Sequence, residues 1–459
     1  MTKELLLPEI QELIATQKWA ELRDIMEEWP VAEIADIMME QEQGERVVFF
    51  RILPRHLSSD VFAYLDPEYQ NSLLDDLTAE ETRHLLANLA PDDRTMLLDE
   101  LPGQVTQRLL NLLSPQDLKE VRQLLGYPEY SVGRLMTPDY VAVRPNWTIQ
   151  QALDHIRQMG KTSETINVIY VTDTQWLLID SLDLSALILA KPEDLVSDIM
   201  DEQYVAIHAS EDREIAVDML KKYDKIVLPV IDSSGILLGI VTVDDLLDVA
   251  EEEATEDFQK MGGVSALDTS YLNADIWTLF KKRSGWLAVL FLGQMFTASA
   301  MERFESELST LLALAIFIPL IISSGGNSGS QATSLIIRAM AVGDIGLSDW
   351  WKVMRREAIV GLILGVFLAV IGLMRVLAWD YLGFYDYDGS AVLISLTVAV
   401  ALVGVVSWGS LVGSMLPFLL RRLGLDPATS SAPFVATLVD VTGLLIYFSA
   451  AQWMIRLFQ

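Results

Sequence analysis

The stretch STLLALAIFIPLIISSGGNSGSQATSLII, residues 309–337, runs for 29 residues without a charged side chain. Four other runs are uncharged or nearly so: 284–301, 358–374, 389–420 and 427–455. A helix that crosses a hydrocarbon core of about 30 Å needs about 20 residues, so each run is suited to span a bilayer. The alternative, buried helices of a soluble protein, rarely supplies five such runs in succession. We therefore predict a five-helix α transmembrane domain over residues 284–459.

Charge divides the 459-residue chain into two parts. The net charge is −31, of which residues 1–282 carry −30 and residues 283–459 carry −1. A field this negative repels nucleic acid and anionic lipid, which excludes a nucleic-acid-binding role, and it attracts cations. The chain has no cysteine, so disulfides and thiolate metal sites are excluded, and its N-terminus lacks a signal-peptide pattern.

Basic residues near the ends of the five runs predict the orientation in the membrane. Nine of them lie on the side of the acidic half and three on the other side. Because basic residues favour the cytoplasmic side, we expect the acidic half in the cytoplasm and the C-terminus outside, in a cell (plasma or inner) membrane. The nine are Lys281, Lys282, Arg283, Arg338, Lys352, Arg355, Arg356, Arg421 and Arg422.

Two polar features lie inside the apolar runs. Asp440 sits in PFVATLVDVTGLLIYF (433–448), where an ionised carboxylate costs several kcal/mol unless it faces water or a cation. The polar run 323–331 contains Asn327, Ser328 and Gln331, whose side chains are suited to line a water-filled pathway. Two alternatives stay open at this point. Asp440 would be a protonated structural carboxylate, and the small residues of 323–331 would form a helix-packing seam.

A 12-residue repeat runs through the N-terminal part of the acidic half. A leucine recurs at this spacing, usually with a proline one or two residues later, at Leu53, Leu65, Leu77, Leu89, Leu101 and Leu113. Proline suits the first turn of a helix, so each unit is predicted to be a short helix and a turn. We expect residues 1–128 to form an α-helical superhelical N-domain that serves as scaffold or interaction surface.

A second repeat follows at a spacing of 64 residues. VGRLM (132–136) and YVAV (140–143) match VSDIM (196–200) and YVAI (204–207), and each copy continues as a helix and a β-rich run. Residues 129–250 thus resemble a tandem pair of α+β CBS domains, 129–194 and 195–250. Thr242 and Asp245 match the Thr-x-x-Asp that contacts ribose in nucleotide-binding members. The first copy is shortened and lacks the glycine turn of the second, which weakens the expectation of ATP as a ligand.

The second copy continues into DDLLDVAEEEATEDFQK (244–260), which contains no glycine or proline and shows helical apolar spacing. Asp245, Asp248, Glu252 and Glu256 share one face of this helix, where like charges repel. An acidic helix that leads toward membrane spans would suit a divalent-cation sensor. The plainer interpretation is a solvated acidic face. We assign residues 251–283 to a connecting, or plug, helix.

With these parts in this order, the whole sequence resembles the MgtE family of magnesium channels. The stretches GGNSGSQATSLIIRAMAVGDI (325–345), LPFLLRRLGLDPA (416–428) and PFVATLVDVTGLLIYF (433–448) carry the resemblance. It implies a homodimer with a pore lined by the second and fifth spans. It also implies Mg²⁺-binding carboxylates at Asp440, Asp426, Asp212, Glu214, Asp224, Asp245, Asp248, Glu253, Glu256 and Asp257.

The resemblance implies a function without catalysis: a Mg²⁺ channel for uptake, shut when cytosolic Mg²⁺ binds the acidic patches of the N, CBS and plug regions. Mg²⁺ prefers oxygen ligands, and the chain has no cysteine and only 4 histidines. Two other functions remain open on the sequence, an ion-coupled divalent-cation transporter and a membrane-tethered nucleotide sensor.

Overall fold

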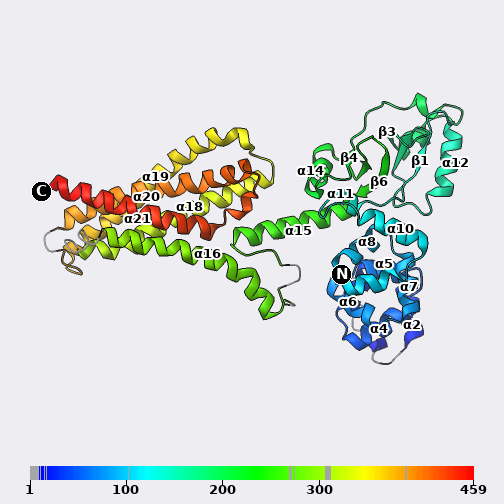
Figure 1. Ribbon diagram of the computed structural model, residues 1–459, viewed down its shortest axis with the longest axis horizontal. Coiled ribbons are helices and arrows are strands. Elements are labelled where there is room, and N and C mark those ends of the chain that lie inside the picture. Colours follow the sequence, from blue (N-terminus) through cyan, green and yellow to red (C-terminus); the bar gives the residue numbers. More distant parts are fainter. Residues whose placement is uncertain are drawn as a thin grey trace. The chain divides into compact units, whose positions relative to one another are not determined.

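The computed structural model describes residues 10, 12–14, 16, 18–101, 103–267, 271–272, 274–304, 312–387 and 390–458 (Figure 1). It divides into two compact units, Met1–Glu251 and Glu252–Gln459, which we treat separately. Residues 309–311 and 389, at the beginnings of two predicted spans, lie outside the described residues.

The first unit opens with the predicted stack of short helices. These are α2 (Trp19–Met26), α3 (Val31–Met39), α4 (Gln43–Ile52), α5 (Ser58–Ala63), α6 (Pro67–Asp76), α7 (Ala79–Asn88), α8 (Pro91–Glu100), α9 (Gly103–Leu110) and α10 (Pro115–Leu124). The last five helices begin 12 residues apart, and α6, α8 and α10 each begin at a proline, as the repeat predicts. Repeating leucines such as Leu77 and Leu89 are buried in one continuous core.

Two CBS copies follow in the same unit. The first contains α11 (Val132–Leu135), β1 (Ala142–Val143), α12 (Ile149–Met159), β2 (Val168–Thr172), β3 (Leu178–Asp183) and α13 (Leu184–Leu189). The second contains η1 (Val196–Asp198), β4 (Ile207–His208), α14 (Arg213–Tyr223), β5 (Val227–Ile231), β6 (Leu237–Thr242) and the beginning of α15 (Val243–Met261). Each sheet pairs its first two strands parallel and its last two antiparallel, in the orders β1-β2-β3 and β4-β5-β6.

The hairpin turn of the first CBS copy forms without the glycine that the second copy has. Trp176 adopts φ +66° where Gly235 of the second copy adopts +83°. In both turns an aspartate accepts two backbone N–H groups, Asp173 in the first and Asp232 in the second. In the first copy a tryptophan thus occupies the left-handed position of the turn. The hydrogen bonds to Asp173 hold this turn in the conformation that glycine usually favours.

Within its described residues, the second unit holds five helices long and apolar enough to cross a membrane, which agrees with the five predicted spans. They are α16 (Ile276–Arg303), α18 (Ile318–Ala341), α19 (Trp350–Tyr381), α20 (Ala391–Arg422) and α21 (Ala432–Phe458), with η2 (Leu312–Phe317), η3 (Leu347–Asp349) and η4 (Pro427–Thr429) between them. In this unit α18, α20 and α21 pack on one another, α16 packs on α21, and α19 packs on α20 (Figure 1).

The connecting segment is not one continuous helix over 251–283. Helix α15 ends at Met261, and Gly263 follows with φ +73°, a conformation that favours glycine. A Cβ on Gly263 would lie 2.7 Å from Cδ1 of Trp286 on α16, so the chain turns tightly against that helix. Residues 276–283 belong to the beginning of α16.

Candidate ion pathway and acidic clusters

Asp440 lies in the first third of α21, where it faces two other helices of the membrane unit. Its carboxylate is half-buried, and Gln294 Nε2 on α16 donates a hydrogen bond to Oδ2 at 3.3 Å. On the other side Oδ1 approaches the backbone of α18, because a Cβ built on Gly326 would be 3.5 Å from it. The carboxylate is therefore held at the junction of α16, α18 and α21 by a neutral partner. Within its helix it is the one carboxylate.

Helix α18 presents two different faces. Ser323, Asn327 and Gln331 are exposed and four residues apart, so they share one face, on which Asn327 Nδ2 lies 3.5 Å from Ser323 Oγ. Ser328 does not share it, because its hydroxyl is buried and lies 2.7 Å from Ser410 Oγ on α20. The structure thus brings Asn327 and Gln331 together on the exposed face and places Ser328 in a helix contact.

The opposite face of α18 is a close helix-packing seam with α20. Gly325 and Gly329 on α18 meet Gly409 and Gly413 on α20, and a Cβ on Gly413 would lie 2.1 Å from the Gly329 carbonyl oxygen. Thr333 Oγ1 donates to the Gly413 carbonyl at 2.8 Å. The packing-seam interpretation of the run 323–331 therefore holds for this face, while Asn327 and Gln331 on the exposed face stay predicted pathway residues.

At the end of α15, Lys260 joins this helix to the connection between α20 and α21. Its Nζ lies 2.8 Å from Asp426 Oδ2 and 2.5 Å from Glu256 Oε1. Burial alone would lower the Lys260 pKa, but the hydrogen bonds that its ammonium donates to Asp426 and Glu256 raise the pKa above its usual value. Burial, and then the charge of Asp426, raise the pKa of Asp257 to about 6. Three predicted carboxylates, Asp426, Glu256 and Asp257, thus gather around one cation, while Glu253 lies one turn earlier on α15.

A second acidic cluster lies within the first unit, where the helical stack meets the CBS pair. Burial, and then the charge of Asp245, raise the pKa of Asp92 well above its usual value. Burial and the charges of Glu164 and Asp244 raise the pKa of Asp93 to about 6. The pKa of Asp245 rises to about 7 through burial, although its hydrogen bond from Thr242 Oγ1, at 2.8 Å, opposes the rise. These carboxylates are forced together against their mutual repulsion.

Of this cluster, the sequence singled out only Asp245 and Asp248. Asp248 contributes because its charge raises the pKa of Asp93. Asp92, Asp93 and Glu164 were missed. Pro91-Asp92-Asp93 opens α8, where acidic residues are ordinary companions of a helix N-terminus, so no local signal marked them as ion-binding. In the predicted nucleotide pair, Thr242 donates a hydrogen bond to Asp245, and Asp245 is itself a member of this cluster.

Three other predicted carboxylates lie at the two ends of α14, Asp212 and Glu214 at its beginning and Asp224 at its end. Asp212 caps the N-terminus of α14, where its Oδ1 accepts the Glu214 backbone N–H at 2.9 Å. Asp224 caps the other end of this 11-residue helix with φ +53°, so about 16 Å of helix separates the two positions. Among the residues that the structure describes, no group of three or more His, Cys, Asp or Glu is arranged to hold a metal ion.

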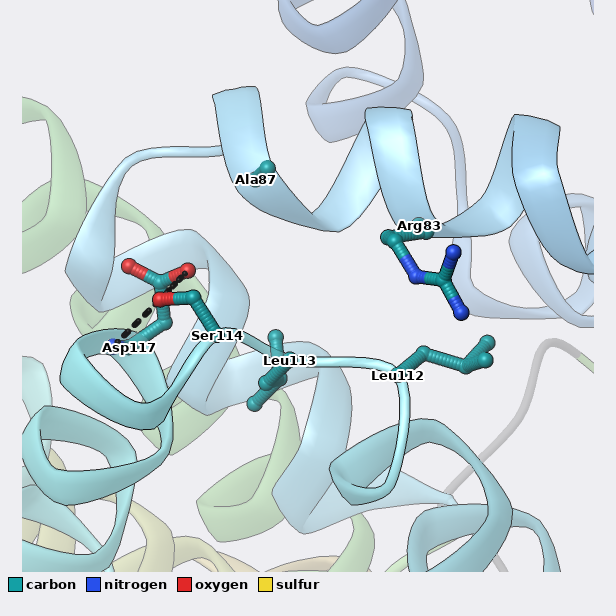
Figure 2. Close-up of a pocket in the computed structure, with 6 residues that line it drawn as sticks. All are labelled: Arg83, Ala87, Leu112, Leu113, Ser114 and Asp117. Atoms are coloured by element: carbon teal, nitrogen blue, oxygen red, sulfur yellow. Dashed lines mark hydrogen bonds between the residues drawn. The ribbon is translucent and has the colours of Figure 1, made fainter.

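The helical stack also contains an open hollow of about 280 Å³, lined by Arg83, Ala87, Leu112, Leu113, Ser114 and Asp117 (Figure 2). Two of these residues form the N-terminal cap of α10, in which Ser114 Oγ accepts a hydrogen bond from the Asp117 backbone N–H. None of the predicted site residues lines it.

Family models match three parts of the chain. A divalent cation transporter model, MgtE, matches residues 318–450, the MgtE intracellular N domain matches 29–130, and the CBS domain matches 132–178 and 196–252. Together these matches cover most of the described membrane helices and both soluble modules. Asp440, Asn327 and Gln331 lie in the first of them, and Asp92 and Asp93 lie in the second.

Full-length relatives and solved structures agree with these matches. The magnesium transporter MgtE of Thermus thermophilus is 40% identical over 457 residues, 99% of each chain, and that of Enterococcus faecalis is 34% identical over 74% of this chain and 72% of its own. A crystal structure of the cytosolic domain of the Mg²⁺ channel MgtE in complex with ATP has a TM-score of 0.50 and 36% identity, covering 52% of this chain and 98% of its own. The soluble part of a magnesium transporter has a TM-score of 0.52 and 27% identity, covering 55% and 99%. The chain belongs to the MgtE family of divalent cation transporters.

Proposed function

We propose that this protein is a Mg²⁺ channel for uptake, and that Asp440 forms the ion site of its pore. The observation that carries the proposal is the placement of this carboxylate inside a membrane span, beside Gly326 of a helix whose exposed face bears Asn327 and Gln331. A carboxylate at this depth is costly without water or a cation nearby. The names of the full-length relatives, all magnesium transporters, favour Mg²⁺ as the ion.

The pore would form between two copies of the chain. The exposed polar face of α18 has no covering helix among the described residues of one chain, and a second copy related by a two-fold axis would place another such face against it. Two Asp440 carboxylates would then balance one divalent ion. Because Mg²⁺ gives up its water reluctantly, the amides of Asn327 and Gln331 would bind its hydration shell rather than the bare ion.

The gate would be formed by the acidic groups of the soluble parts. Without Mg²⁺, carboxylates such as Asp93 and Asp245 repel one another; burial is the largest cause of the raised pKa of Asp245, and the charge of Asp93 adds to it. With Mg²⁺, the ions would bridge these carboxylates and those of α15, and the pore would close. The remaining gating carboxylates are Asp92, Asp212, Glu214, Asp224, Asp248, Glu253, Glu256, Asp257 and Asp426. The acidic half would face the cytoplasm, where it samples the imported ion.

ATP would act at most as a modulator, through Thr242 and Asp245. The relative crystallised with ATP favours this, while the hydrogen bond between these two side chains means that ribose would have to replace an existing contact.

Ion flux through the purified full-length chain in liposomes tests the proposal. Mg²⁺ is varied on each side with no other ion gradient. Passive uptake that falls as Mg²⁺ on the side of the soluble half rises supports a gated channel. An ion-coupled transporter, the second candidate, would instead require a proton or sodium gradient, for which the Asp440 carboxylate offers a titratable group. No flux under either condition rejects both.

A further inference from the structure

The beginning of α16 reverses the charge of the soluble half that precedes it. Residues 276–283 read IWTLFKKR, three cations and no carboxylate, in a chain of net charge −31. Three of their four apolar side chains are exposed, and Leu279 is half-buried. Ile276, Trp277 and Phe280 are 88%, 61% and 54% exposed. A short basic segment with exposed aromatic side chains is unusual on a strongly acidic protein, which indicates that this segment contacts something outside the described chain.

The aromatic and basic side chains of this segment are organised together. The rings of Trp277 and Phe280 stack with centroids 5.1 Å apart and planes at 17°. The ammonium of Lys281 lies 5.8 Å from the Trp277 ring centroid, within cation–π range, and both Lys281 and Arg283 are exposed. Asp275 fixes the beginning of the helix by accepting the Thr278 backbone N–H at 2.9 Å. The amphipathic indole ring of Trp277 and the neighbouring cations are the kinds of side chain that bilayer interfaces favour.

The length of α16 places this segment at the depth of lipid headgroups. A helix of 28 residues is about 42 Å long, whereas the hydrocarbon core is about 30 Å thick. The uncharged run begins at Ser284, so Trp277 precedes the hydrocarbon edge by about 10 Å. In Figure 1 the beginning of α16 projects beyond the neighbouring membrane helices. The segment is therefore continuous with a membrane span and lies outside the helix bundle.

We propose that residues 276–283 are an interfacial anchor that binds the surface of a bilayer containing anionic phospholipid. The rings of Trp277 and Phe280 lie at the headgroup boundary, and Lys281 and Arg283 contact lipid phosphates. The overall charge of the chain repels such a surface, so the binding is local to this segment. The anchor also sets the depth of α16, the helix that carries the Gln294 partner of Asp440.

The absence of cysteine makes a direct depth measurement available. The variant Trp277→Cys of the full-length chain carries a single nitroxide label and is placed in phosphatidylcholine vesicles with or without phosphatidylglycerol. Electron paramagnetic resonance then measures label accessibility to oxygen and to a neutral nickel chelate. Two matched controls have the same exposure: Leu247→Cys, 62% exposed on α15, and Phe367→Cys, 61% exposed on the apolar α19.

The proposal predicts an oxygen-to-nickel accessibility ratio at position 277 between those of positions 247 and 367. Phosphatidylglycerol raises that ratio, and Lys281→Gln with Arg283→Gln removes the dependence on phosphatidylglycerol. An unchanged ratio at Phe367→Cys in the same background confirms that the membrane unit is still folded. A ratio at 277 equal to that at 247 in both lipids overturns the proposal. Shielding from both reagents, with spin–spin broadening between labels, also overturns it, because a second copy then covers the segment.

Discussion

The ammonium group of Lys260 lies 2.8 Å from Asp426 and 2.5 Å from Glu256, so one cation joins the end of α15 to the turn that precedes α21. Asp426 also accepts the Ala428 backbone N–H, which fixes its carboxylate at the beginning of η4. The end of the acidic helix is thus attached to the membrane unit by a permanent cation, and Asp257 beside it keeps a raised pKa.

Replacement of Lys260 by a neutral residue should make closure of the pore more dependent on Mg²⁺. In Lys260→Gln, the carboxylates of Glu256, Asp257 and Asp426 lose their shared positive partner and repel one another. We expect a higher open probability in Mg²⁺-free solution and restored closure when Mg²⁺ is added, measured by single-channel recording. Lys260→Arg keeps the charge and serves as the control. Equal open probability of Lys260→Gln and the wild type without Mg²⁺ would show that the ion pair does not hold α15.

The acidic cluster of the first unit predicts a pH dependence of stability. The pKa values of Asp93 and Asp245, about 6 and about 7, lie above the usual value near 4, so the neutral forms favour the folded unit. This stabilisation is present at low pH and is lost as the pH rises through 6 and 7. Without Mg²⁺, lowering the pH from about 8 to about 5.5 should raise stability by about 1–3 kcal/mol, one pKa unit being about 1.4 kcal/mol.

Thermal unfolding of the full-length chain in detergent with a chelator measures this effect. Asp93→Asn with Asp245→Asn should flatten the dependence and raise the melting temperature at pH 8. In the wild type, added Mg²⁺ should stabilise most at pH 8, where the carboxylates are ionised. A melting temperature that falls between pH 8 and 5.5 would mean that ion pairs outweigh the cluster. The Glu81 carboxyl, whose hydrogen bond from Arg51 lowers its pKa to about 2, stays ionised in this window.

The seam between α18 and α20 predicts a strong response to one added methyl group. In Gly413→Ala the new Cβ would lie 2.1 Å from the Gly329 carbonyl oxygen, so the helices must separate. We expect a loss of about 1–3 kcal/mol of stability, seen as a lower melting temperature in detergent. Gly285→Ala on α16 is the matched control, because no atom lies within 4 Å of its added Cβ. Equal melting temperatures for the two variants would contradict the close packing.

The two faces of α18 predict opposite phenotypes for neighbouring residues. Gln331→Leu removes a polar group from the exposed face, so Mg²⁺ flux in liposomes should fall while the melting temperature changes little. Ser328→Ala removes the buried hydrogen bond to Ser410, so stability should fall by about 1 kcal/mol while flux persists. Reversed phenotypes would assign the pathway to the face that packs on α20.

The sequence predicted those features that repeat or that have a strong local cause. The 12-residue leucine and proline spacing predicted the helices that begin at Pro67, Pro91 and Pro115, because proline at the first turn is a local rule. The apolar runs predicted the five membrane helices. Asp440 was predicted as an ion site because an ionised carboxylate within such a run is costly without water or a cation, and this role stays a prediction.

Features that depend on tertiary contact were not predictable in the same way. Asp92 and Glu164 belong to different modules, and nothing near either residue shows that folding brings their charges together. The left-handed turn at Trp176 is held by hydrogen bonds to Asp173 rather than by glycine, so the usual signal was absent. Ser328 and Asn327 are adjacent in sequence, and only helix packing decides which of them faces α20.

Mg²⁺ uptake by Asp440→Asn tests the central claim most directly. The amide keeps the size of the side chain and its contact with Gln294 on α16 but removes the negative charge. The purified variant is reconstituted beside the wild type, and its melting temperature and oligomeric state are checked first. The account predicts a correctly folded protein whose Mg²⁺ flux falls to the level of protein-free liposomes. Wild-type flux through the variant would contradict the assignment of Asp440 as the ion site.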